Sequence, residues 1–366
     1  MSKQDEIRVL LFNKKDEELQ KKFNRAKKVT REILMDIAEN DSEWKIRREA
    51  VKFLGKNRVK ESIPLLKKIL LKDHLTVLRK TAAKALGAFP EPDVIKTLLE
   101  SLSFFKDPSI LVEIIIALGE MKSEEAVKPL TELLLQSPDG EIRENCAKAL
   151  GMIGENSAVD ALLEALKKDK EDWVRGAAAE ALGVIGDERA IPALLHAFQN
   201  DIGLGMAAIS AKALGRLKAK EAVESLLEFA QKSQNVENRR AATYALGEIG
   251  DKRAADTLVT LLENDEDESV RYWACLALVF MKVKRATNVF LHTLQQDPSC
   301  HVRKTAALAL RQLEPKTKKA IKILFEVLNK EEEEAEVKEQ VAATLEKIAE
   351  LQGLKDINEL TASLSS

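Results

Sequence analysis

A 32-residue repeat is the feature that most constrains how this chain of 366 residues folds. Nine leucines stand 32 residues apart, at Leu54, Leu86, Leu118, Leu150, Leu182, Leu214, Leu246, Leu278 and Leu310. Glycine follows the leucine except where Val279 and Arg311 replace it, and alanine precedes the leucine from Ala85 onward. A short unit cannot bury its apolar face alone, so a repeat of this length predicts a stacked solenoid.

Residues 172–201 show how one unit is expected to fold. Apolar residues at helical spacing predict a first helix, and Pro192 marks the first turn of a second helix, where its missing N–H costs nothing. We expect Gly183 to lie where the first helix frays, Gly186 to turn the chain with a positive φ, and Asp201 to cap the next helix. The predicted fold is all-α, an α–α superhelix of about ten two-helix repeats.

The ends of the array depart from the repeat. We expect capping helices in residues 1–28, a continuous array over residues 29–350, and a C-terminal cap with a frayed tail over residues 351–366. The N-terminal part predicts a short helix over residues 5–12 and a longer amphipathic helix that carries Leu19, Phe23, Val29, Ile33 and Ile37. Four glutamates at 331–334 delay the last repeat by three residues.

A second column of the repeat is charged. Arginine recurs in the same register at Arg47, Arg79, Arg143, Arg175, Arg239, Arg271 and Arg303. Six residues before that position stand Asp41, Asp73, Asp169, Asp201, Asp265 and Asp297, with Ser137 and Ser233 in two other repeats. This pattern favours a structural ladder of charge-assisted hydrogen bonds between repeats over the alternative, an anion-binding stripe. Leu111 and Ala207 replace the arginine in two repeats, and Gly203 and Gly205 precede Ala207 in what we expect to be a first helical turn.

Aromatic residues gather at positions that the repeat predicts to face an inner, concave surface. Both tyrosines and two of the three tryptophans fall there. The predicted partner-binding groove consists of Trp173, Ile209, Lys212, Arg240, Tyr244, Tyr272, Trp273, Leu276 and Leu308. Aromatic anchors in a groove are typical of a binding site, and the alternative is that these rings pack flat against adjacent helices. In the first two repeats the same positions are mostly basic, with Lys45, Arg48, Lys52, Lys80 and Lys84.

The repeat units, of the form ALGxIGDxRAxxxLxxxLxDxxxxVRxxA, resemble HEAT-like repeats of the phycobilisome-lyase type over about residues 30–350. The resemblance implies the superhelix, whereas its function is open, because such repeats serve chromophore lyases, hydroxylases and adaptors alike. Proteins that resemble deoxyhypusine hydroxylase bind two irons through His-Glu pairs, and none of the four histidines here is followed by glutamate.

Motifs of catalysis are not apparent. The sequence has no P-loop, no GxGxxG and no GxSxG, so we expect no catalytic residues, no cofactor and no metal. Cys146 and Cys275 occupy alanine-like positions that we expect to be buried, and Cys300 beside His301 is a candidate for a reactive thiol. The three cysteines lie too far apart to indicate a disulfide framework or a cysteine-cluster metal site.

The favoured function is therefore a non-catalytic scaffold that binds a protein or peptide segment in the concave groove. The alternative, implied by the resemblance, is a bilin lyase-like or chromophore-handling subunit, in which the groove holds a linear tetrapyrrole for a phycobiliprotein-type acceptor. A formal charge of −2 and an acidic C-terminal part disfavour nucleic acid as a partner. No apolar run is long enough for a membrane helix and no signal peptide is apparent, so we expect a cytoplasmic protein.

Overall fold

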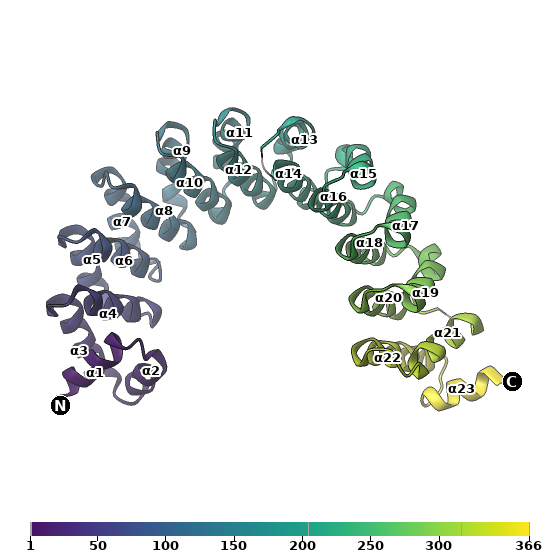
Figure 1. The fold of residues 1–366 in the computed structure, drawn as a ribbon. Helices are drawn as coiled ribbons and strands as arrows, with labels where there is room; N and C mark the ends of the chain where they lie inside the picture. The colour runs from purple at the N-terminus through teal and green to yellow at the C-terminus, as the bar shows by residue number, and fades with distance from the viewer. Residues whose placement is uncertain (1, 204, 316, 366) are drawn as a thin grey trace. The chain divides into compact units, whose positions relative to one another are not determined.

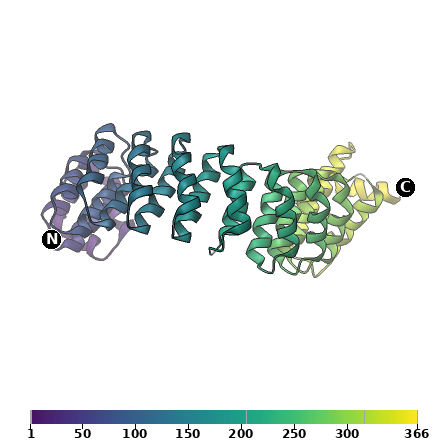
Figure 2. The ribbon, with the colours of Figure 1, turned by 90° about the horizontal axis from the view of Figure 1, so that it is seen from above.

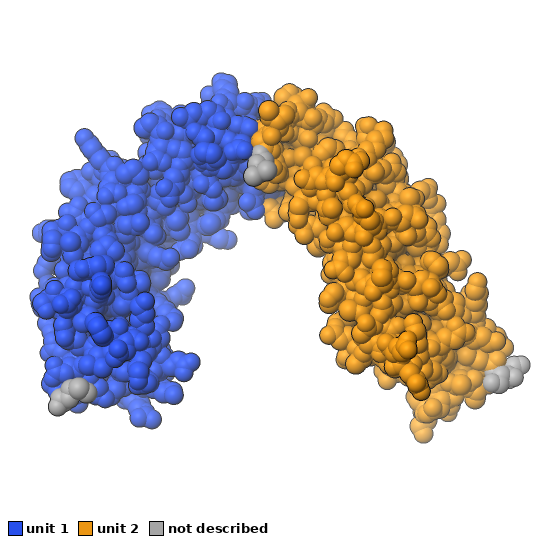
Figure 3. Space-filling view, viewed as in Figure 1, with its two compact units in different colours: residues 1–187 blue, residues 188–366 orange. Residues whose placement is uncertain are grey.

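The computed structural model describes residues 2–203, 205–315 and 317–365. The chain forms two compact units, unit 1 over Met1–Asp187 and unit 2 over Glu188–Ser366 (Figure 3). Helices and the turns between them make up the whole of the described part, so the predicted all-α superhelix of helical repeats is confirmed.

Unit 1 runs from α1 to α12. Its helices are α1 (Lys3–Phe12), α2 (Asp16–Arg25), α3 (Lys27–Asn40), α4 (Trp44–Lys56), α5 (Ile63–Lys72), α6 (Thr76–Leu86), α7 (Pro92–Phe104), α8 (Pro108–Glu120), α9 (Val127–Gln136), α10 (Gly140–Ile153), α11 (Val159–Lys168) and α12 (Asp172–Ile185). Short 3₁₀ turns lead into α5, α9 and α11, at Lys60–Ser62, Glu124–Ala126 and Asn156–Ala158.

Unit 2 continues the same alternation. Its helices are α13 (Ile191–Asn200), α14 (Met206–Arg216), α15 (Val223–Lys232), α16 (Val236–Ile249), α17 (Ala255–Asn264), α18 (Glu268–Phe280), α19 (Thr287–Gln296), α20 (Cys300–Leu313), α21 (Lys318–Asn329), α22 (Ala335–Leu351) and α23 (Ile357–Ser365). Here 3₁₀ turns lead into α13, α15, α17 and α19, at Glu188–Ala190, Lys220–Ala222, Lys252–Ala254 and Lys284–Ala286.

Each unit has two layers of helices. From α4 to α12 in unit 1, and from α14 to α22 in unit 2, the even-numbered helices lie side by side in one layer and the odd-numbered helices in the other (Figures 1 and 2). Neighbouring even-numbered helices pack more closely than neighbouring odd-numbered ones. Each unit therefore bends towards its even-numbered layer, whose exposed face is the concave one.

The glycine column explains this close packing. Gly183 lies inside α12, two residues before its end, so the predicted fraying at this glycine is wrong. In other repeats the equivalent glycine faces the alanine column of the next even-numbered helix. A Cβ added to Gly55 would lie 2.7 Å from the Cβ of Ala85, and one added to Gly247 would lie 2.6 Å from the Cβ of Ala277. Glycine and alanine are thus the two sides of one backbone-to-backbone contact.

The N-terminal end of the chain also differs from expectation. The single amphipathic helix predicted after residue 12 is two helices, α2 and α3, which separate at Ala26. The break lets both helices pack against α1 as well as each other, which one straight helix cannot do, and it leaves Val29 exposed. At the other end, where we expect a cap and a frayed tail, Ile357–Ser365 form α23, with Leu360 fully buried.

The entry to α14 is a further correction. Asp201 ends α13 and accepts a hydrogen bond from the N–H of Gly203 at 2.8 Å, but it does not cap α14, whose N-cap is Gly205. Gly205 is left-handed, with φ +75°, so it precedes the first helical turn instead of lying in it. The helix begins two residues later in the repeat than α16 does, because the glycines do not favour helix there.

A left-handed residue follows most even-numbered helices. Gly186 has φ +85°, as expected, and Gly154 and Gly250 take the same position in their repeats. Other repeats place a residue with a side chain at this position, namely Arg58, Lys122, Lys218, Lys282 and Glu314, with φ between 48° and 54°. The left-handed region costs such residues about 1–2 kcal/mol, which glycine does not pay.

We expect Lys122→Gly and Lys282→Gly each to raise the free energy of unfolding by about 0.5–1 kcal/mol. Relief of the left-handed strain outweighs the greater backbone freedom that glycine gives the unfolded chain. The matched control is Lys212→Gly, an exposed position inside α14, which is expected to cost about 1 kcal/mol. Urea unfolding followed by circular dichroism tests the opposite signs, and destabilisation by all three substitutions would contradict the argument.

Candidate functional site

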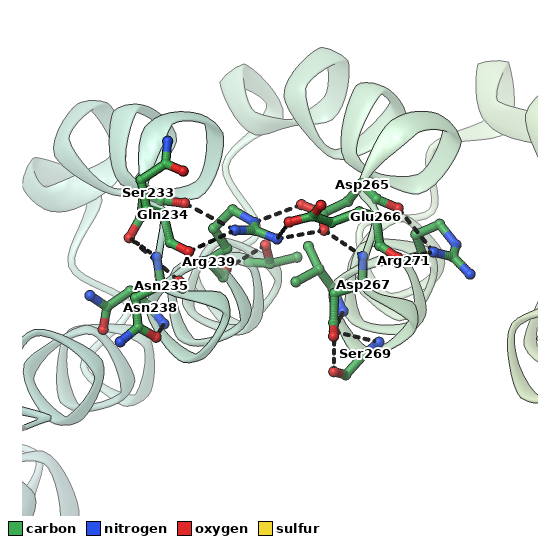
Figure 4. Close-up of polar contacts among 12 residues, drawn as sticks. Ser233, Gln234, Asn235, Asn238, Arg239, Asp265, Glu266, Asp267, Ser269 and Arg271 are labelled. Carbon is green, nitrogen blue, oxygen red and sulfur yellow. Dashed lines mark hydrogen bonds and ion pairs between the residues drawn. The ribbon is translucent and has the colours of Figure 1, made fainter.

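The arginine column joins consecutive repeats. Arg239 on α16 donates from Nε and Nη2 to the two carboxylate oxygens of Asp265, at 2.9 and 3.0 Å (Figure 4). Its Nη1 donates to the carbonyl oxygen of Ser233 at 3.0 Å. Because Ser233 and Asp265 lie in consecutive turns, each leading into an even-numbered helix, one guanidinium connects two repeats. The acid partner stands 26 residues after the arginine.

The same geometry recurs along both units. Arg143 contacts both carboxylate oxygens of Asp169 at 2.7 and 2.9 Å, and Arg271 contacts those of Asp297 at 2.8 and 3.1 Å. Arg47 pairs with Asp73. Arg303 reaches Glu333, which the insertion of glutamates brings into the ladder, with its Nε at 3.0 Å. Arg175 donates to the carbonyl oxygen of Asp169 at 3.0 Å.

Two departures from the ladder lose the arginine and the acid together, and a third loses the acid alone. Leu111 replaces the arginine where Ser137 replaces the acid 26 residues later, and Ala207 does so where Ser233 replaces the acid. Where only the acid is lost, Arg79 keeps its bond to the carbonyl oxygen of Asp73 and lies 5.5 Å from the ring centre of Phe105, at the acid's position. The repeats with Leu111 and Ala207 thus avoid an unpaired buried charge, whereas Arg79 keeps a carbonyl oxygen and a ring as its partners.

The ladder perturbs the titration of its members. The hydrogen bonds that Arg239 donates to Asp265 raise the pKa of Arg239, and those that Arg271 donates to Asp297 raise the pKa of Arg271. Burial alone would raise the pKa of Asp169, but the hydrogen bonds from Arg143 and from the N–H of Glu171 outweigh it and lower the pKa. A carboxylate with a lowered pKa stabilises the fold above its unfolded pKa, and that contribution is lost as the pH falls through the folded value.

Three rings of the predicted groove form one cluster in unit 2. Tyr244 on α16 lies edge-to-face with Trp273 on α18, with ring centres 5.0 Å apart, and Tyr272 packs on Trp273 at 5.5 Å. All three side chains are half-buried. The rings therefore support one another, edge-on rather than flat, and still present part of their surface to solvent. We call Tyr244, Tyr272 and Trp273 the aromatic cluster.

A groove of about 410 Å³ opens beside the aromatic cluster, between α18 and α20. Tyr272 lines it from α18, and Leu308 lines it from α20. Sequence reasoning missed the other lining residues, which are Glu268, Ser269, Ser299, His301, Val302, Lys304 and Thr305. The sequence feature that could have revealed this groove is the break in the glycine column at Val279. The close contact between helices is lost there, and α18 packs less closely on α20 than on α16.

The remaining predicted groove residues are placed as follows. Ile209 is half-buried and Lys212 exposed on α14, Arg240 pairs with Glu237 at 2.5 Å on α16, and Leu276 on α18 is half-buried. Trp173 belongs to α12 of unit 1, where it is 51% exposed, so the aromatic cluster is built without it. Phe280, which the sequence did not single out, is 63% exposed at the end of α18.

Other candidate sites are not supported in the described part of the chain. No group of three or more histidine, cysteine or acidic side chains there is arranged to hold a metal ion. Burial raises the pKa of the Cys146 and Cys275 thiols well above the ordinary value. Among the described helices, none has the length and apolar character needed to cross a bilayer.

Comparison with known proteins identifies the repeat. A family profile of HEAT repeats matches residues 31–104, 104–182, 135–204, 205–279 and 256–346. None of the curated proteins matches the sequence significantly.

Solved structures share the architecture. Yeast importin-β (Kap95p) superposes with a TM-score of 0.62 at 15% identity, over 89% of this chain and 51% of the importin chain. The chain thus spans about half the length of that relative. Escherichia coli YibA gives a TM-score of 0.51 at 20% identity, over 71% of this chain and 95% of YibA. The CpcE–CpcF complex of phycocyanin lyase from Nostoc sp. PCC7120 gives 0.42 at 21% identity, over 63% and 92%. At these identities the likeness concerns the fold alone.

Proposed function

The chain belongs to the HEAT-repeat family, and from that premise we propose that it is a non-catalytic scaffold that binds a protein or peptide segment on the concave side of unit 2. The observation that carries the proposal is the aromatic cluster, whose half-buried rings stand beside an open groove. Rings that are braced by one another lose little freedom when a partner covers them, which is the property of a binding anchor.

The residues of the proposed binding site make two kinds of contact, apolar and polar. Tyr272 and Leu308 offer an apolar floor to a side chain of the partner, while the rim is polar, and Leu276 is half-buried on the same helix as Tyr272. Arg240 and Lys212 supply polar contacts that orient the segment, and Arg240 is held in place by Glu237. An apolar centre with a polar rim is the usual anatomy of a protein interface.

A peptide library displayed on phage tests the proposal. Peptides enriched on the wild-type protein are expected to lose at least about tenfold in affinity for Tyr272→Ala/Trp273→Ala, since hot-spot truncations cost 2 kcal/mol or more. The matched control, Phe229→Ala/Phe325→Ala, removes two half-buried rings from the odd-numbered layer and should leave the affinity unchanged. Equal affinity for wild type and the groove variant, with both folded by circular dichroism, would reject the site.

A further inference from the structure

Unit 1 has a second and larger groove on its concave face, separate from the aromatic cluster. It has a volume of about 1210 Å³ and is lined mainly by α4, α6 and α8. Its basic side chains are Lys52, Lys56, Arg58, Lys80 and Lys84. A hollow of about 380 Å³ adjoins it, shares Leu11 and Glu49 with it, and adds Lys14, Lys45 and Arg48.

Several of these cations are available to a ligand. Glu49 engages Arg48 at 2.7 Å and Lys52 at 3.0 Å, so its own charge is balanced from both sides. Within the described residues, Arg58, Lys80 and Lys84 make no ion pair, and neither do Lys14 and Lys45. Lys80 and Lys84 are one helical turn apart on α6, which places two cations side by side on the groove wall.

Charge is concentrated in this part of the chain. The two hollows together carry eight basic and four acidic side chains. Residues 1–100 have 24 basic and 16 acidic groups, although the whole chain is slightly negative. A basic concave surface of this kind attracts acidic ligands and raises their local concentration.

We propose that this groove, which we call the basic groove, binds an acidic segment of a protein partner, independently of the aromatic cluster. The carboxylates of the segment pair with Lys80, Lys84 and Arg58. A peptide fits better than a nucleic acid because Glu113 and Glu120 line the α8 wall and would repel a continuous phosphate backbone.

Fluorescence anisotropy with the full-length protein tests the proposal. The probes are three fluorescein-labelled peptides, of alternating glutamate and serine, glutamine and serine, and lysine and serine. We expect only the glutamate peptide to bind, with an affinity that falls as salt is raised. Lys80→Glu/Lys84→Glu is expected to weaken this binding by at least about tenfold, since it replaces two attractions with two repulsions.

The matched control is Lys128→Glu/Lys167→Glu, which makes the same change of net charge on exposed positions of α9 and α11. It should alter the affinity by less than about twofold, because these lysines lie outside the groove. Equal losses in the two variants, or no salt-dependent binding of the glutamate peptide, would overturn the proposal. Preferential binding of a uridine homopolymer would overturn it in favour of RNA. The Tyr272→Ala/Trp273→Ala variant should bind the glutamate peptide normally, which separates this groove from the proposed function.

Discussion

Replacing Arg271 by leucine is expected to lower the free energy of unfolding by about 3 kcal/mol or more. The substitution leaves the Asp297 carboxylate, whose side chain is 4% exposed, without its bidentate partner. It also removes the donor to the carbonyl oxygens of Asp265 and Glu266. A buried unpaired charge and orphaned acceptors are both costly. Urea unfolding followed by circular dichroism and tryptophan fluorescence measures the loss.

Arg240→Leu is the matched control for this experiment. Arg240 also pairs with an acid, Glu237, but both side chains are substantially exposed and lie one turn apart on the same helix. Such a pair contributes less than about 1 kcal/mol. If the two substitutions lower the free energy of unfolding equally, the arginine column does not hold the repeats together, and the result favours the anion-binding interpretation.

A second substitution separates the charge from the packing. Adding Asp297→Ser to Arg271→Leu is expected to recover part of the stability, because Leu111 and Ser137 make this same combination in unit 1. Serine keeps the turn, since the Oγ of Ser137 accepts the N–H of Asp139 at 3.2 Å, as Asp297 accepts that of Ser299 at 2.8 Å. If the double variant loses as much free energy of unfolding as the two single variants lose in sum, the result contradicts the pairing.

The repeat and the fold class were predictable because a strict period leaves few architectures open. The hydrogen-bond partners of the arginines within the ladder were not predictable. Along the arginine column, one acid stands six residues before the arginine and another stands 26 residues after it. Spacing alone does not say which of these two acids the arginine side chain contacts. The structure assigns the carboxylate to the later residue and the carbonyl oxygen to the earlier one, as Arg271 with Asp297 and Asp265 shows.

The groove beside the aromatic cluster was only partly predictable. Helical periodicity puts Tyr244, Tyr272 and Trp273 on one surface, but the exposure of a ring depends on the side chains of two neighbouring helices, which a single period does not contain. Lys304 and Thr305 carry no unusual pattern in the sequence, and His301 is singled out there only as the neighbour of Cys300. Val279, which breaks the glycine column, was the one sequence feature that marked this groove. Its effect on helix packing can be interpreted only once the role of the glycine column is known, and the contact of Gly247 with Ala277 shows that role.

Gly247→Ala is expected to lower the free energy of unfolding by about 2 kcal/mol, although alanine favours helix over glycine by about 1 kcal/mol. The new Cβ would lie 2.6 Å from the Cβ and 3.0 Å from the Cα of Ala277. Neither atom can rotate away, so α16 and α18 must move apart along their contact. The loss of close packing then outweighs the gain in helix propensity, and urea unfolding of the full chain measures the sign.

Two further variants identify the cause of that loss. Gly140→Ala, in the first turn of α10, meets nothing closer than 3.4 Å and is expected to be neutral or stabilising by up to about 1 kcal/mol. Gly247→Ala/Ala277→Gly removes the 2.6 Å contact but keeps the one at 3.0 Å, so a partial recovery of stability is expected.

Because the helices part in Gly247→Ala, the aromatic cluster that joins Tyr244 to Trp273 should loosen as well, and peptides selected on the wild type should bind more weakly. Stability at or above the wild-type level in Gly247→Ala would show that the glycine column is not needed for close packing.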